Sequence, residues 1–114
     1  MLEWTALSGS VNVIRNPAGG PALNDGQWHN IIVAFDRTLG QASSYVDGVL
    51  VNSANITPLG TLVTGNGLTI GQDPTGAYGV SGAFDLDDLG IWRRALSPAE
   101  AAGISTIDGK RIRF

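Results

Sequence analysis

The sequence contains no cysteine and only one histidine among its 114 residues. Without cysteine, the chain can form no disulfide bond, bind no zinc through thiolates and perform no thiolate chemistry. The single histidine, His29, would have to serve any Ser-His-Asp triad, yet no Gly-x-Ser-x-Gly motif is present to supply the serine. Hydrolysis of that type is therefore disfavoured. We expect a structural role for His29, bonded to a backbone carbonyl beside a buried Trp28.

Basic residues and long apolar runs are also scarce. Seven Lys and Arg stand against ten Asp and Glu, which gives a net charge of −3 and no basic stripe for nucleic acid. Membrane insertion is not expected, because no apolar run approaches the roughly 18 residues that cross a bilayer. The N-terminus, Met-Leu-Glu-Trp-Thr, has neither the positive region nor the apolar stretch of a signal peptide. The chain is therefore expected to be either cytosolic or a piece of a larger exported protein.

The residues that are present predict a single all-β domain over 1–114. Glycine is frequent, at 16 residues, and charged residues make up only 15% of the chain. The segment 28–35 is apolar on both faces, which is typical of a central strand. Residues 42–46 and 49–52 are predicted to form a hairpin across Asp47-Gly48, because this dipeptide favours tight turns. Further short strands are expected at 8–15, 62–64, 68–70 and 110–114.

A buried strand is predicted at 84–91. Leu89 and Ile91 are two residues apart and share one strand face, but Leu86 lies three residues before Leu89. A β-bulge at Asp87-Asp88 would absorb the extra residue and return Leu86 to the core. The pattern therefore places two adjacent carboxylates on a locally distorted strand.

A short helix is predicted to start at the motif Ser97-Pro98-Ala99-Glu100. Ser97 can cap the first free N–H groups, Pro98 suits the first helical position, and Glu100 can close a capping box. Many short strands with one small helix near the C-terminus indicate an antiparallel β-sandwich of jelly-roll type. A parallel α/β fold is disfavoured, because no long amphipathic helices separate the strands.

Three segments, taken in order, resemble a known family. They are Asn-Asp-Gly-Gln-Trp-His-Asn-Ile-Ile-Val-Ala-Phe-Asp at 24–36, Ser-Tyr-Val-Asp-Gly-Val-Leu at 44–50, and Leu-Thr-Ile-Gly at 68–71 followed by Asp-Leu-Asp-Asp-Leu-Gly-Ile-Trp-Arg-Arg-Ala-Leu-Ser-Pro-Ala-Glu at 85–100. Together they resemble the laminin-G-like, concanavalin A-like jelly-roll domains that are common in bacterial surface and exported proteins. A looser similarity to pentraxins runs through the same segments. The resemblance covers residues 22–104 and implies an extracellular or cell-surface location.

The resemblance also implies that part of the sandwich is missing. Such domains usually have several strands before the Trp-His strand, and here only about 25 residues precede it. An incomplete sandwich would expose unpaired strand edges and an apolar face. We therefore predict that the chain forms a homo-oligomer or is completed by another chain.

A carbohydrate site is predicted in the long glycine-rich loop 71–82. Gln72, Asp73 and Tyr78 lie close together in this loop. They offer an amide, a carboxylate and an aromatic ring, which are the groups that bridge paired hydroxyls and stack on a sugar. The alternative is an ordinary glycine-rich loop without a ligand.

Asp87 and Asp88 are predicted calcium ligands. The resemblance implies this role, because Asp87 matches the position at which similar sugar-active jelly rolls hold a structural calcium. Oxygen ligands at a bulge suit this hard cation. The alternative is a solvated bulge in which Asp88 pairs with Arg93 or Arg94.

Catalysis is disfavoured, and no enzyme activity is predicted. Asp85 and Asp87 could in principle form an acid–base pair for glycoside cleavage. The glycosidases that this chain resembles instead use glutamates in a Glu-x-Asp-x-x-Glu strand, and the only glutamates here are Glu3 and Glu100. We therefore predict a non-catalytic module that binds glycans or a surface protein, with calcium as the candidate cofactor. The alternatives are a structural or adhesion module that self-assembles and, more remotely, a degenerate glycoside hydrolase.

Overall fold

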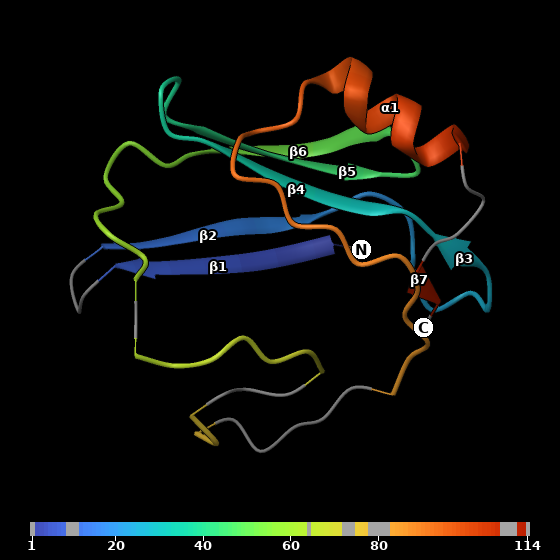
Figure 1. Cartoon of the computed structure of the whole chain (residues 1–114), viewed down its shortest axis with the longest axis horizontal. Helices are drawn as coiled ribbons and strands as arrows, with labels where there is room; N and C mark the ends of the chain where they lie inside the picture. Colours follow the sequence, from blue (N-terminus) through green and yellow to red (C-terminus); the bar gives the residue numbers. More distant parts are fainter. Residues whose placement is uncertain are drawn as a thin grey trace.

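The computed structural model describes residues 2–8, 12–63, 65–71, 75–77, 83–107 and 112–113 (Figure 1). The elements in these ranges are β1 Leu2–Ser8, β2 Asn12–Gly19, β3 Trp28–His29, β4 Ile31–Asp36, β5 Gln41–Val46, β6 Val49–Asn55, α1 Pro98–Ile107 and β7 Ile112–Arg113. The ladders between these strands are antiparallel. The predicted all-β antiparallel fold with one short C-terminal helix is therefore confirmed. Within the described ranges, no helix has the length and hydropathy to cross a membrane.

Strands β4, β5 and β6 form the central sheet, in that order. The predicted hairpin joins β5 to β6, and its turn residues Asp47 and Gly48 have φ angles of 52° and 80°. Positive φ at both central residues is the type I′ geometry that Asp-Gly favours. The turn also lies against α1, because a Cβ at Gly48 would be 3.1 Å from Ala102 Cα and 3.2 Å from Ser105 Cβ. The hairpin and the helix are therefore in direct contact.

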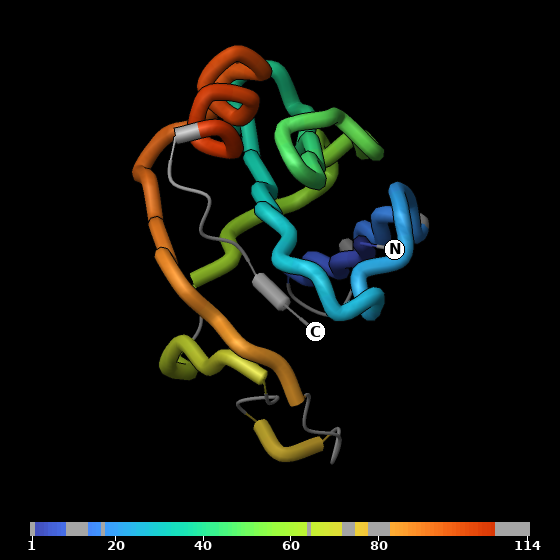
Figure 2. The backbone as a smooth tube through the Cα atoms, turned by 90° about the vertical axis from the view of Figure 1, so that its right-hand side faces the viewer, coloured from blue at the N-terminus to red at the C-terminus, as the bar shows by residue number. Residues whose placement is uncertain are grey.

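The β1–β2 hairpin covers one face of the central sheet (Figures 1 and 2). The Trp4 and Phe35 rings meet there, with their centroids 5.0 Å apart. The Trp4 Nε1–H donates a hydrogen bond to Ser44 Oγ at 2.9 Å, which satisfies the polar end of the indole within apolar surroundings. The buried residues of this core are Ala6, Ala42, Ile56 and Leu59.

Helix α1 covers the opposite face of the central sheet (Figure 1). The predicted capping box is confirmed at its start: the Glu100 N–H donates to Ser97 Oγ at 3.2 Å, and the Ser97 N–H donates to Glu100 Oε2 at 2.8 Å. These bonds satisfy N–H groups that a helix start leaves without intrahelical partners. The core beneath the helix is formed by Ile32, Tyr45, Leu96 and Ala101, with Ile104 packed against them.

The predicted buried strand at 84–91 is wrong. Along it, the described residues form no ladder longer than a single bridge. Leu86, Leu89 and Ile91 are 38%, 59% and 74% exposed. A local distortion is present at the predicted place, since Asp88 has a φ of 53°. Without strands paired on both sides, the alternating apolar side chains of this segment have no core to enter.

The N-terminal region also differs from the prediction. The expected strand 8–15 is replaced by two strands: it covers only the last residue of β1 and the first half of β2. Strand β2 continues through Pro17. The register shifts at this point and leaves Pro17 and Ala18 opposite Glu3 alone. A bulge of this kind tolerates proline, because its missing N–H removes no ladder hydrogen bond there.

The remaining strand predictions are confirmed only in part. The segment 28–35 splits into β3 and β4 at Asn30, and β4 pairs only with β5 in the described part of the chain, so it is an edge rather than a central strand. Strand β7 lies within the predicted 110–114 and pairs with β3. The described residues of 62–64 and 68–70 form no strand.

Candidate functional site

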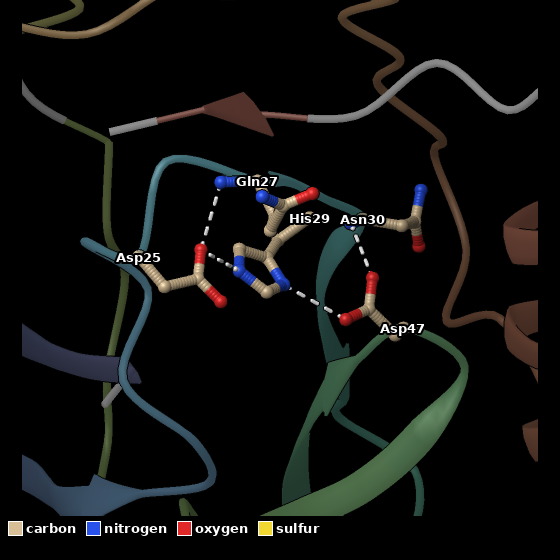
Figure 3. A network of polar contacts seen from close by, with 5 residues as sticks. All are labelled: Asp25, Gln27, His29, Asn30 and Asp47. Carbon is tan, nitrogen blue, oxygen red and sulfur yellow. Dashed lines mark hydrogen bonds and ion pairs between the residues drawn. The ribbon is translucent and has the colours of Figure 1, made fainter.

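A network of polar contacts surrounds His29, where β3 approaches the β5–β6 turn (Figure 3). The imidazole lies between two carboxylates: Nδ1 is 2.8 Å from Asp47 Oδ2, and Nε2 is 3.0 Å from Asp25 Oδ1. The His29 side chain is only 9% exposed. Both ring nitrogens face acceptors, so both must carry protons for both bonds to form, and the ring is then an imidazolium. The predicted backbone-carbonyl partner of His29 is therefore wrong, and carboxylates take its place.

The network shifts the pKa values of its members. The hydrogen bond to Asp47 is the main cause that raises the pKa of His29, while burial opposes the rise and Asp25 adds to it. The pKa of Asp25 is lowered, first by the Gln27 N–H that donates to its Oδ1 at 2.8 Å and then by His29. Asp47 Oδ1 also accepts the Asn30 N–H at 2.9 Å. Because both ring nitrogens are hydrogen-bonded to carboxylates, His29 links the loop before β3 to the β5–β6 turn rather than serving as a base.

Asp87 and Asp88 lie on the exposed segment that precedes α1. Asp87 Oδ1 accepts the Asp88 N–H at 2.9 Å. Calcium takes roughly six to eight oxygen ligands. In the ranges that the structure describes, no group of three or more His, Asp or Glu side chains could hold a metal ion. These two carboxylates alone do not complete a calcium shell, so their metal role stays a prediction.

Arg94, one of the two arginines considered as partners of Asp88, forms an ion pair with Glu100. Its Nη2 is 2.7 Å from Glu100 Oε1, and its Nη1 is 2.8 Å from Glu100 Oε2. This two-pronged contact, together with the Ser97 N–H, lowers the pKa of Glu100 to about 2. The same contact raises the pKa of Arg94. The pair fixes the segment before α1 to the first turn of the helix.

An apolar groove of about 730 Å³ runs along the edge of β4 that pairs with no strand in the described part of the chain. One side is formed by Ile31 to Phe35 of β4, and the other by the segment from Gly90 to Arg94. Two large side chains of the latter segment, Ile91 and Trp92, are 74% and 48% exposed. Leu68 and Leu96 complete the lining. An apolar groove beside an unpaired strand edge is unusual on a monomeric domain and marks a surface that can associate.

A comparison with known families bears on this geometry. A laminin-G-type family model, described as the concanavalin A-like lectin/glucanases superfamily, matches residues 2–102. The chain belongs to this superfamily. The match begins at β1, so the superfamily pattern includes the N-terminal hairpin as well as the region 22–102. Laminin-G-like and pentraxin-like domains are typically non-catalytic binding modules.

Several curated proteins share the superfamily pattern. Neuronal pentraxin-1 of Rattus norvegicus is 30% identical over 119 residues, covering 98% of this chain and 28% of that protein. Pentraxin-4 of Homo sapiens is 36% identical over 110 residues, covering 87% of this chain and 23% of that protein. The calpain-type cysteine protease ADL1 of Oryza sativa subsp. japonica is 32% identical over 101 residues, covering 77% of this chain and 5% of that protein. The chain thus spans less than a third of each relative.

A solved structure has a fold similar to that of this chain. It is the S-layer domain-containing protein of Clostridium thermocellum, residues 221–444, with a TM-score of 0.54 and 22% sequence identity. The match covers 83% of this chain and 45% of that chain. At this identity the likeness concerns the fold alone. It supports the layered arrangement of the central sheet.

Of the predicted site residues of this concanavalin A-like domain, only Asp87 and Asp88 lie within the described ranges. Gln72, Asp73 and Tyr78 lie outside the described residues, so the carbohydrate loop stays a prediction. Asp87 and Asp88 lie on the exposed segment before α1. The structure instead gathers polar side chains around His29, and it gathers apolar ones beside β4.

Proposed function

We propose that this laminin-G-like domain is a non-catalytic module that binds a carbohydrate or another cell-surface ligand, within an exported or surface protein. The observation that carries the proposal is the match of a lectin and glucanase superfamily over residues 2–102. The similarity to pentraxins over nearly the whole chain favours binding over catalysis.

The state of the carboxylates supports binding rather than cleavage. A glycosidase of this superfamily would need a carboxylic acid that donates a proton near neutral pH. Glu100 is paired with Arg94, and its pKa of about 2 keeps it ionised. Glu3 lies on β1, across the central sheet from α1 (Figure 1). The chain also has no cysteine, and so lacks the nucleophile of a cysteine protease.

The ligand contacts that we propose are those of the glycine-rich loop. Gln72, Asp73 and Tyr78 supply the amide, carboxylate and ring that sugar binding uses. Calcium at Asp87 and Asp88 is the proposed cofactor, with its remaining oxygens drawn from backbone carbonyls, water or residues outside the described ranges. Both carboxylates are exposed and therefore reachable by a cation.

A glycan array probed with the chain tests this function. We expect saturable binding to a subset of glycans, weakened by EDTA and restored by added calcium. A variant that carries Asp87→Asn and Asp88→Asn should bind equally with and without EDTA, because the calcium ligands are then lost. Failure to bind any glycan contradicts the carbohydrate ligand. Binding by the parent chain that EDTA does not change contradicts the calcium role.

Self-assembly is a second function, which the groove along β4 favours. Strand β4 is apolar on both faces, yet its pairing in the described part of the chain is only to β5. A strand from a second copy could add to its free edge, satisfy the backbone groups there and cover Ile91 and Trp92. The second copy would then supply what an incomplete sandwich lacks.

Light scattering at micromolar concentration tests self-assembly. We expect a dimer or a larger assembly for the parent chain, and a shift toward monomer for Ile91→Lys, since a charge in the groove opposes association. Leu39→Lys is the matched control, because Leu39 is also 74% exposed but lies outside the groove. A monodisperse monomer of the parent chain at this concentration contradicts self-assembly.

A further inference from the structure

A pocket of about 350 Å³ lies on the α1-covered face of the central sheet, between the first turn of the helix and the β4–β5 turn. This pocket adjoins the groove along β4, with which it shares Ala34, Arg94 and Leu96. Its floor is formed by the strands β4 and β5. Its walls are formed by the β4–β5 turn on one side and by the segment 94–98 with Glu100 on the other.

Strand alternation makes the floor polar. Residues two apart share a sheet face, so Gln41, Ser43 and Tyr45 of β5 all face the helix side. The register places Asp36 opposite Gln41 and Ala34 opposite Ser43. Tyr45 is buried under α1, as a helix-covered sheet face requires. Gln41, Ser43 and Asp36 break this apolar pattern at the end of the face where the pocket lies.

The polar groups of the floor have hydrogen-bonding capacity to spare. Asp36 uses only Oδ1, which accepts the N–H groups of Thr38 and Leu39 at 3.0 and 2.9 Å. Within the described ranges, Asp36 Oδ2 and the side chains of Gln41 and Ser43 form no hydrogen bond. A carboxylate oxygen, an amide and a hydroxyl therefore converge on one pocket without protein partners.

The apolar surface and the charges of the pocket walls limit which ligands can bind. Leu39, which is 74% exposed, and Leu96 supply apolar surface. Arg94 and Glu100 neutralise each other in their ion pair, so Asp36 leaves the pocket with a net negative charge. An anionic ligand is therefore disfavoured. Apolar surface combined with a few convergent polar groups suits a small polyhydroxylated molecule, whose hydroxyls both donate and accept.

We propose that this pocket binds one neutral hexose residue of a glycan, with Asp36, Gln41 and Ser43 as its hydrogen-bonding side chains. The volume of about 350 Å³ suits a single sugar ring. This assignment rests on the proposed binding function but places a sugar contact on the face of the central sheet that α1 covers.

The test is an NMR titration with the methyl glycosides of glucose, galactose and mannose. We expect amide shifts at 36–43 and 94–97 in the parent chain for at least one glycoside. Affinity should fall roughly tenfold in the Gln41→Ala/Ser43→Ala double variant, because two hydrogen bonds to the ligand are lost. Gln27→Ala, which removes an exposed glutamine outside the pocket, is the matched control and should stay within twofold of the parent.

The outcomes of the titration and of the glycan array distinguish a failure of the pocket assignment from a failure of the proposed function. A glycoside that binds with shifts elsewhere, or with equal affinity for parent and double variant, overturns the pocket and leaves the proposed function standing. No response to any glycoside from a chain that binds on the glycan array also overturns the pocket alone. No binding in either assay overturns both. If the double variant fails to fold, Ser43→Ala removes a single oxygen and should still weaken binding several-fold.

Discussion

Leu96→Ala is expected to lower the free energy of unfolding by roughly 2–5 kcal/mol. Leu96 is 8% exposed and packs with Ile32 and Tyr45 between the central sheet and α1. Truncation removes these apolar contacts and leaves a cavity between the sheet and the helix that relaxation of the structure fills only in part. Leu96 also lines the groove along β4 and the proposed hexose pocket, so the truncation should also disturb the walls of both. Urea denaturation followed by tryptophan fluorescence measures the loss.

Leu89→Ala is the matched control for this prediction. It makes the same chemical change at a side chain that is 59% exposed. The expected change is within about 0.5 kcal/mol, because little apolar surface is removed from a packed environment. A loss at Leu89 that equals or exceeds the loss at Leu96 would mean that α1 does not pack on the central sheet as described.

His29→Gln is expected to lower the free energy of unfolding by roughly 2 kcal/mol at pH 5.5, since charge-assisted hydrogen bonds to two carboxylates are weakened or lost. The same contacts raise the pKa of His29 above its ordinary value of 6.5. A raised pKa contributes stability that is fully present below pH 6.5 and is lost as the pH rises through the folded-state value. The difference between parent and variant should therefore shrink at alkaline pH.

At acidic pH, the stability difference between parent and His29→Gln depends on Asp25. Its pKa is lowered below the ordinary value of 3.8, so its contribution is present above that pH and is lost as the pH falls through the folded-state value. The gap between parent and His29→Gln should thus be widest between about pH 4 and 6.5. Urea denaturation across a pH series measures it. His29 is the only histidine, so no other imidazole contributes to the alkaline slope. A gap that widens above pH 6.5 would refute the imidazolium network.

Features with local causes could be predicted from the sequence. The Asp47-Gly48 turn follows from the positive φ that its two residues tolerate, and the helix start follows from the side chains of Ser97 and Glu100 within one turn. The antiparallel class follows from many short strands without long helices between them. Each of these depends on residues close together in the chain.

Features with distant causes could not be predicted in this way. Asp47 is 18 residues from His29, and the two meet only because the register pairs Ile31 with Val46. The Asp25 contact had a local signal in its four-residue spacing from His29. Segment 84–91 was expected to be buried, because the spacing of its apolar residues is that of a strand with neighbouring strands on both sides. The floor of the hexose pocket depends on the β4–β5 register.

Binding without turnover is the claim on which the proposed function depends. It is tested most directly by titrating the chain in a calorimeter with a glycan that the array identifies, and then recovering the glycan for mass spectrometry. We predict saturable binding and a recovered glycan of unchanged mass. Shorter saccharides, with masses that sum to the glycan plus one water, would show hydrolysis and contradict it.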